Sequence, residues 1–165
     1  MLAAIEKRDG MDYRLATEEE MDQLVRMRWD FTLEDYPEMI TASDGYEAFE
    51  EECTDFLEQA LTGDRWHIWI AEDKGRVISH MYIELIEKVP RPGRITCPFA
   101  YMTNVYTVPD WRGKGIGGKL LSQVNAWVKD NDYEFVIVWP SEEGVDFYKR
   151  HGYKQCNDPL EYVPS

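Results

Sequence analysis

Residues 104–121, NVYTVPDWRGKGIGGKLL, combine glycines with basic side chains in a pattern suited to binding an anion. The glycines let backbone N–H groups turn toward one point, and a helix beginning there adds a partial positive charge. Arg112, Lys114 and Lys119 place cations around the same turn. The glycines of this turn are Gly113, Gly115, Gly117 and Gly118. The stretch therefore predicts a binding site for a phosphate or pyrophosphate group.

Two common phosphate-binding motifs fit this stretch only in part. Gly113, Gly115 and Gly118 match the dinucleotide fingerprint, but fewer than fifty residues follow, too few for the second mononucleotide unit that usually accompanies it. The phosphate-loop pattern ends at Lys119, where Leu120 replaces the Ser or Thr that binds magnesium. A nucleotide-binding module remains an alternative, and it predicts stabilisation by NAD or ATP.

A third pattern, Arg112-x-x-Gly115-x-Gly117, lies between a predicted strand and a predicted amphipathic helix. A second block, VIVWPSEEGVDFYKRHGY at residues 136–153, predicts a further strand and helix. Its closing pattern consists of Phe147, Tyr148, Gly152 and Tyr153. In their order and spacing the two blocks resemble the GNAT superfamily of acyl-CoA-dependent N-acetyltransferases.

This resemblance implies that acetyl-CoA is a co-substrate and that no metal is needed. In that family the strand before the glycine turn parts from the strand after the next helix, and the pantetheine arm enters the gap like an added strand. Backbone contacts to the arm are expected from Val105, Tyr106 and Val108, with an amide near Tyr106 polarising the thioester carbonyl. The other expected cofactor-binding residues are Arg112, Gly113, Lys114, Gly115, Ile116, Gly117, Gly118, Lys119 and Ser141, where many relatives carry an Asn.

Two residues are candidates for the proton transfers of acetyl transfer. Tyr148 matches the family's usual general acid, and a phenol with an ordinary pKa near ~10 can protonate a departing thiolate. Its alternative role is core packing beside Phe147. The strand at residues 99–108 contains no carboxylate, so Glu84 on the preceding strand is the first candidate for the general base; a solvated strand glutamate is the alternative.

The negative charge of the chain is concentrated near its N-terminus. The formal net charge is −14, and residues 17–58 contain 15 acids against Arg26 and Arg28, a net of −13. This balance argues against a nucleic-acid partner and is compatible either with a cationic acceptor or with a solubilising face. Arg28 lies in an otherwise apolar helical stripe, for which a structural ion pair is the preferred interpretation. Since the family's first two helices form the acceptor side, Arg28 and Trp29 are also the candidate substrate-binding residues.

The composition predicts one folded domain spanning residues 1–165. Hydrophobic residues make up 44% of the sequence, and its apolar runs are far shorter than a membrane span, so we expect a cytoplasmic protein without a membrane partner. The three cysteines and three histidines are scattered, which indicates neither a disulfide framework nor a metal site.

Hydrophobic periodicity predicts an α/β fold of the α+β kind. Strands are expected at residues 11–16, 66–72, 77–87, 99–108 and 134–139, the last buried on both faces, with one or two more at the C-terminus. Helices are expected at residues 17–35, about 44–62, 115–131 and 141–150. Thr17 and Glu20 predict a capping box, and Ser43 or Asp44 a second helix cap. The GNAT resemblance makes this a mixed, mainly antiparallel sheet, splayed between two strands and flanked by helices on both faces.

The preferred function is transfer of an acetyl group from acetyl-CoA to a primary amine of a cationic small molecule or peptide by direct attack, in a monomer or homodimer. One alternative is a non-catalytic acyl-CoA-binding sensor, in which Tyr148 only packs. Another is a protein N-terminal or lysine acetyltransferase.

Overall fold

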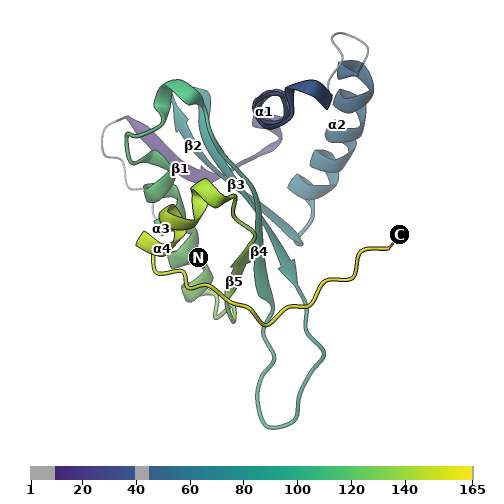
Figure 1. The fold of residues 1–165 in the computed structure, drawn as a ribbon, viewed down its shortest axis with the longest axis vertical. Helices are drawn as coiled ribbons and strands as arrows, with labels where there is room; N and C mark the ends of the chain where they lie inside the picture. The colour runs from purple at the N-terminus through teal and green to yellow at the C-terminus, as the bar shows by residue number, and fades with distance from the viewer. Residues whose placement is uncertain (1–9, 40–44, 165) are drawn as a thin grey trace.

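The computed structural model describes residues 10–39 and 45–164 and contains one five-stranded sheet in the order β1-β2-β3-β4-β5 (Figure 1). The strands are β1 (Met11–Leu15), β2 (Trp66–Asp73), β3 (Arg76–Ile86), β4 (Phe99–Thr107) and β5 (Val136–Val138). The first four pair antiparallel, whereas β5 pairs parallel to β4. The predicted mixed, mainly antiparallel sheet is confirmed.

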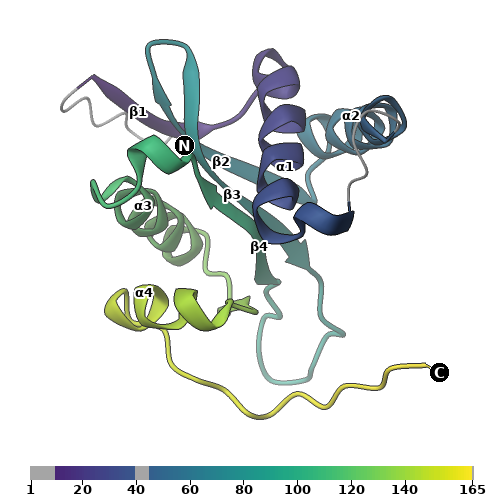
Figure 2. The ribbon, with the colours of Figure 1, turned by 45° about the horizontal axis from the view of Figure 1, so that its top comes forward.

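Helices cover both faces of this sheet (Figure 2). They are α1 (Met21–Asp35), α2 (Tyr46–Thr62), α3 (Ile116–Asp130) and α4 (Val145–Arg150). The pair α1 and α2 lies on one face, and the pair α3 and α4 on the other. This layering follows from the chain order, because the parallel β4-α3-β5 connection must cross one face of the sheet.

Local sequence signals explain where several elements begin and end. The capping box is present: the Thr17 side chain accepts from the Glu19 amide, and the Glu20 carboxylate accepts from the Thr17 amide at 2.8 Å. Lys74 and Gly75 both have positive φ, as in the tight turns that join two antiparallel strands, here β2 and β3. The predicted caps Ser43 and Asp44 lie outside the described residues.

Two apolar clusters anchor the helix pairs to the sheet. Under α1 and α2, the fully buried side chains include Leu24, Leu57 and Ile70. Under α3 and α4 they include Met102 and Leu120. Both faces of β3 and β4 are thus covered, so the middle of the sheet is close-packed on both sides.

Three details of the sequence prediction are wrong. Arg28 is exposed instead of lying in the buried stripe of α1, because that stripe runs through Leu24, Val25 and Met27. The last strand, Val136–Val138, has only three residues and is half-buried, because it forms the edge of the described sheet. The segment at residues 153–164 contains no strand.

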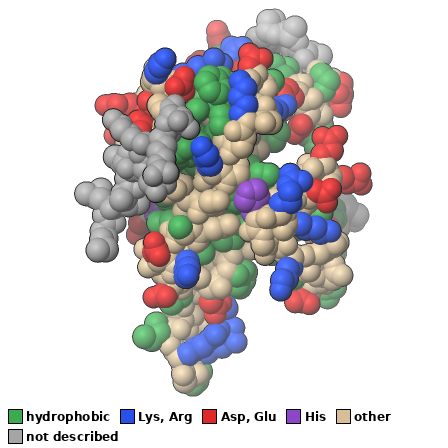
Figure 3. Space-filling model, turned by 90° about the vertical axis from the view of Figure 1, so that its left-hand side faces the viewer, with side chains coloured by type: hydrophobic (Ala, Val, Ile, Leu, Met, Phe, Trp, Pro, Cys, Tyr) green, Lys and Arg blue, Asp and Glu red, His purple; other side chains and the backbone are tan. Residues whose placement is uncertain are grey.

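The long loop between β3 and β4 projects from the rest of the protein as a narrow lobe with Lys and Arg side chains near its tip (Figures 1 and 3). Glu134 pairs with two residues of this loop, Lys88 near its start and Arg94 near its middle, the latter at 2.5 Å. No helix among the described residues combines the length and apolar character needed to cross a membrane.

Replacing Leu120 by alanine tests the packing of α3 on the sheet. Leu120 is fully buried, so Leu120→Ala should lower the free energy of unfolding by about 2–5 kcal/mol. The matched control is Leu160→Ala, since Leu160 is 100% exposed and its loss should change the value by less than about 0.5 kcal/mol. Urea unfolding of both variants measures this, and equal effects would contradict the packing described here.

Candidate active site

The paired strands β4 and β5 separate at one end. Their parallel pairing stops at Met102 and Val138, whereas β4 continues to Thr107. Just beyond the last pair, β4 contains a bulge: Asn104 has φ +47°, and the pairing with β3 skips between His80 and Tyr82. A bulge bends its strand and increases the local twist, which turns β4 away from β5. The predicted splay of the sheet is therefore present.

Hydrogen bonds on β4 show which of its backbone groups face the gap. The amide of Val108 donates to the carbonyl of Ile78 on β3 at 3.0 Å, and the Tyr106 carbonyl accepts from the Ser79 hydroxyl at 3.0 Å. Successive residues of a strand present their backbone groups to opposite edges, so Val105 and Thr107 face the gap. By the same alternation the backbone groups of Tyr106 and Val108 point toward β3, whereas Thr107, which was not predicted, faces the gap. The contacts of these residues with the arm stay predictions.

The glycine turn, residues 112–119, leads from β4 into α3. Gly113 and Gly115 have φ of +71° and +76°, values that favour glycine because other residues are strained there. Gly115 caps α3, whose first N–H groups have no partner within the helix, so they face outward at its positive end. The geometry predicted for an anion-binding turn is present.

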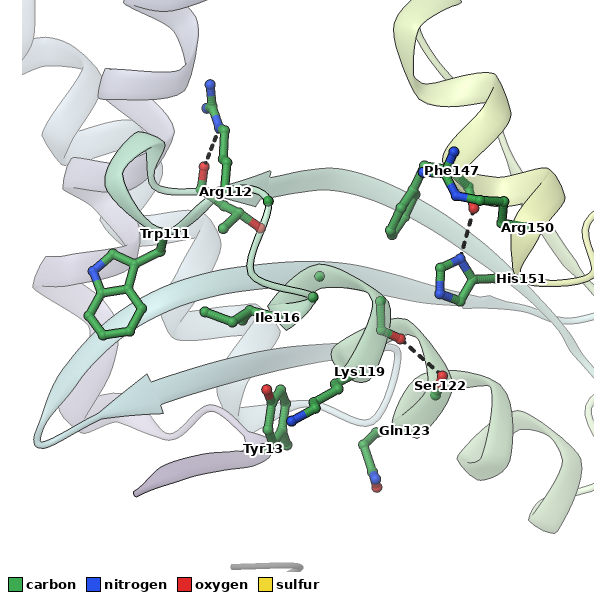
Figure 4. Close-up of a pocket in the computed structure, with 15 residues that line it drawn as sticks. Tyr13, Trp111, Arg112, Ile116, Lys119, Ser122, Gln123, Phe147, Arg150 and His151 are labelled. Atoms are coloured by element: carbon green, nitrogen blue, oxygen red, sulfur yellow. Dashed lines mark hydrogen bonds between the residues drawn. The ribbon is translucent and has the colours of Figure 1, made fainter. Parts of the chain in front are cut away.

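A cavity of about 910 Å3 opens over this turn (Figure 4). Tyr13, Trp111 and Arg112 lie on one side of the turn; Phe147 and Arg150 of α4, and His151 just after it, lie on the other. Gly117 lies at the floor, where an added Cβ would stand 3.5 Å from the Thr107 hydroxyl. The cavity therefore reaches from the exposed turn to the last residue of β4, beside the gap between the strands.

The basic groups around the cavity come from two elements. Arg112 and Lys119 were predicted, whereas Arg150 and His151 were missed. Their spacing in the sequence could have identified them, because residues three and four positions after Phe147 lie on the same side of a helix. Lys114 does not line the cavity; its ammonium lies 4.8 Å from the centre of the Trp111 ring.

Ser141 has a structural partner of its own. Its hydroxyl accepts from the Gly144 amide at 3.2 Å and so caps the turn before α4, and it does not line the cavity. Its contact with the cofactor stays a prediction.

Arg112 is held by an acidic residue from α1. Glu34 accepts from Arg112 at 2.7 Å and from the Tyr106 hydroxyl at 2.6 Å. Burial acts in the opposite direction, but these two hydrogen bonds hold the pKa of Glu34 below its ordinary value. Arg112 also donates to the Thr107 carbonyl at 2.8 Å. The glycine turn is thus tied to α1 through a carboxylate that the sequence analysis did not single out.

The candidate acid Tyr148 is a buried residue of α4. Its ring packs against Phe147 and Tyr153, with centroid distances of 5.1 and 5.4 Å. Burial raises its pKa to about 12, so the phenol stays protonated at neutral pH. Phe147 faces the cavity over the glycine turn, whereas Tyr148 lines a second cavity of about 540 Å3 between β5 and the C-terminal segment. Its catalytic role stays a prediction.

A histidine holds the bulge of β4 from β3. His80 is fully buried, and its Nδ1 lies 2.8 Å from the Asn104 carbonyl oxygen. Because a carbonyl can only accept, Nδ1 carries the proton and Nε2 a lone pair. No partner for Nε2 occurs among the residues described. Burial lowers the pKa of His80 to about 4, so the ring is neutral near pH 7.

The remaining candidates lie on the α1 and α2 face or at its border. The Glu84 carboxylate pairs with Arg65 at 2.5 Å and is 13% exposed. Trp29 packs against Tyr46 and Phe49 of α2, at centroid distances of 5.0 and 5.4 Å. Their roles as base and substrate contact stay predictions.

A sequence model of the acetyltransferase (GNAT) domain matches residues 64–155. The match covers more than half of the chain and includes the β4 bulge, the glycine turn and α4. The chain belongs to the GNAT acetyltransferase family. It is therefore an N-acetyltransferase, as the two sequence blocks predicted.

Solved structures share the fold of this GNAT protein over nearly its whole length. A predicted acetyltransferase from Clostridium acetobutylicum, crystallised with acetyl-CoA, has 27% identity and a TM-score of 0.74, covering 93% of this chain and 96% of that one. Glucosamine-6-phosphate N-acetyltransferase from Arabidopsis thaliana has 18% identity and a TM-score of 0.67, covering 93% and 97%. An aminoglycoside acetyltransferase from an uncultured soil sample has 15% identity and a TM-score of 0.70, covering 95% and 98%. No curated protein matches the sequence.

The described residues contain no group of three or more His, Cys, Asp or Glu side chains that could hold a metal ion.

Titration of His80 should make the stability of this GNAT protein depend on pH. The unfolded histidine takes up a proton near pH 6.5, whereas the folded one stays neutral down to about pH 4. The unfolded state therefore binds more protons in this window, and stability falls as the pH falls. The loss from His80 between pH 7.5 and 4.5 is on the order of 3 kcal/mol.

The variant His80→Asn keeps a donor near the position of Nδ1 but does not titrate. Urea unfolding of both proteins across this range should show a flatter dependence for the variant. An identical pH dependence would show that His80 does not stay neutral in the fold.

Proposed function

We propose that this enzyme transfers the acetyl group of acetyl-CoA to the primary amine of a small molecule or peptide that is cationic at neutral pH. The observation that carries the proposal is the adjacency of the β4–β5 gap and the glycine turn. An anion seated at the turn lies beside an unpaired strand edge, which is the arrangement that a pyrophosphate with a pantetheine arm requires.

The residues present fit acetyl-CoA as the co-substrate. The α3 amides with Lys119 and Arg150 offer donors and positive charge to the phosphates. The backbone of Val105 and Thr107 offers hydrogen bonds to the amides of the arm. A structural neighbour was crystallised with acetyl-CoA, which supports the same assignment.

The reaction needs three things from the chain. The neutral amine attacks the thioester carbonyl carbon, and a β4 amide that faces the gap, that of Val105, stabilises the developing oxyanion. The carbon–sulfur bond then breaks, and Tyr148 donates its proton to the thiolate. The amine loses its proton to a base, for which Glu84 remains the first candidate once it is released from Arg65.

The acidic segment at residues 17–58 supports a cationic acceptor, since a net charge of −13 attracts a protonated amine. Two neighbours of the same fold are named for amine-bearing sugars, an aminoglycoside and glucosamine-6-phosphate. A protein terminus or lysine is the second candidate acceptor, and a sensor that binds acyl-CoA without turnover is the alternative to catalysis.

The direct test measures thiol release from acetyl-CoA across a panel of primary amines, together with thermal stabilisation by CoA. We expect stabilisation by CoA, none by NAD or ATP, and thiol release with at least one amine class. Stabilisation without thiol release for any amine or peptide would favour the sensor. An unchanged melting temperature with saturating CoA would overturn both.

Charge at the glycine turn should decide cofactor affinity. In Gly117→Glu the new carboxylate lies where the pyrophosphate is expected, and repulsion at about 4 Å should weaken CoA binding about 100-fold or more. The control Gly117→Gln has nearly the same size without the charge and should lose much less. Calorimetric titration with CoA compares the two variants, and equal losses would mean that size rather than charge matters.

The hydroxyl of Tyr148 should be needed for turnover. Tyr148→Phe keeps the ring that packs on Phe147 and Tyr153, so CoA binding should change little. If thiolate protonation limits the rate, turnover should fall by roughly 10²- to 10⁴-fold, about 3–5 kcal/mol of barrier. Single-turnover acetylation from pH 6 to 9 measures this, and full activity throughout would leave the ring as core packing alone.

A further inference from the structure

Arg28 is an exposed cation beside the β4 bulge. Its guanidinium donates to the side-chain oxygen of Asn104 at 3.3 Å and lies 5.5 Å from the centre of the Phe31 ring. Both partners are uncharged, and the hydrogen bond is longer than a strong charge-assisted one. Most of the donor capacity of a guanidinium is therefore left for another group.

Among the described residues Arg28 has no carboxylate partner, which is unexpected in so acidic a segment. Within residues 17–58 there are 15 acids and two arginines. The other arginine, Arg26, pairs with Asp30 at 3.0 Å, one turn along the helix. In the described ranges 10–39 and 45–164, no carboxylate lies within 4.0 Å of Arg28.

The location of Arg28 connects it to the reacting centre. Asn104 precedes Val105, whose backbone faces the gap between β4 and β5. Burial lowers the pKa of His80 to about 4, with the positive charge of Arg28 contributing in the same direction. The positive charge of Arg28 therefore acts on His80, the residue that holds the bulge, on the face of the sheet covered by α1 and α2.

We propose that Arg28 binds an anionic group of the acceptor, so that the acceptor is an amine that also carries a carboxylate, as an amino acid does. The proposal rests on the proposed function and narrows its substrate class. A guanidinium binds a carboxylate through two parallel hydrogen bonds, which fixes orientation as well as position. A carboxylate held there places an amine a few atoms away within reach of the gap.

An acceptor that carries both a positive and a negative charge explains two features of this face, its many acidic residues and the position of Arg28. The acidic segment attracts the ammonium end, but by itself it would repel a carboxylate. An arginine whose partners among the described residues are uncharged removes that repulsion at one point only. The face would then select for an amine with an anion at a set distance and against amines without one.

The experiment compares matched amines in thiol release from acetyl-CoA. Each L-amino acid is paired with its amide, which keeps the amine and removes the negative charge; ethanolamine phosphate paired with ethanolamine tests phosphate in place of carboxylate. With the unmodified enzyme, the anionic member of the best pair should have a kcat/KM about 10- to 150-fold higher, the range for a hydrogen bond to a charged group.

The variant Arg28→Gln should remove this preference by raising KM for the anionic member while leaving the amide nearly unchanged. Arg28→Lys should retain part of the preference, since lysine keeps the positive charge but lacks the paired N–H groups of the guanidinium. The matched control is Arg26→Gln, which removes the same charge from the same helix and should keep the preference. Equal loss in both glutamine variants would show a general field effect and would overturn the proposal.

A binding measurement separates this proposal from the proposed function. In the presence of CoA, the preferred amino acid should raise the melting temperature of the unmodified protein but not of Arg28→Gln. If CoA binds and amines without an anion are acetylated equally well, the function stands and the Arg28 proposal falls. If nothing is acetylated but the amino acid stabilises only the unmodified protein, the proposed catalysis falls and the Arg28 site stands. A preference for phosphate over carboxylate would overturn the carboxylate assignment.

Discussion

The separation of β4 from β5 is the constraint on which the rest of the site depends. Two strands that pair along their whole length satisfy each other's backbone groups, whereas a strand that bends away leaves donors and acceptors free for another partner. Here the bend occurs at Asn104, where β4 places an extra residue opposite β3. Buried His80 holds the carbonyl of that residue, so the bend is secured from inside the sheet.

The glycine turn depends on the same bend, because it begins at Arg112, only five residues after Thr107, the last residue of β4. The direction in which β4 ends decides where α3 begins and where its free amides face. Thr107 connects the two features: its carbonyl accepts from Arg112, and its hydroxyl lies near Gly117. A change in the bulge would therefore move the glycine turn as well as the strand edge.

Electrostatics divides this protein into two sides. The cavity over the turn is lined by basic side chains from two elements, although the whole chain carries a net charge of −14. The acids are concentrated on the segment that forms α1 and α2, across the sheet from α3 and α4. Glu34 connects the two sides by binding both Arg112 and Tyr106. Under the proposed function, the anionic donor and the cationic acceptor would approach the gap from regions of opposite charge.

The sequence by itself determined most of the helices and strands and the glycine turn, because these depend on short-range rules. Capping at Thr17, the turn at Gly75 and the left-handed glycine at position 115 follow from backbone chemistry within a few residues. Only the tertiary structure showed that Arg28 is exposed beside Asn104, that His80 is neutral and holds the bulge, and that Glu34 binds Arg112. These partners are 24 to 78 residues apart in the chain, and no periodic pattern encodes which of many similar side chains will meet. Contacts of that kind are decided by how the helices pack on the sheet, which is a property of the whole fold.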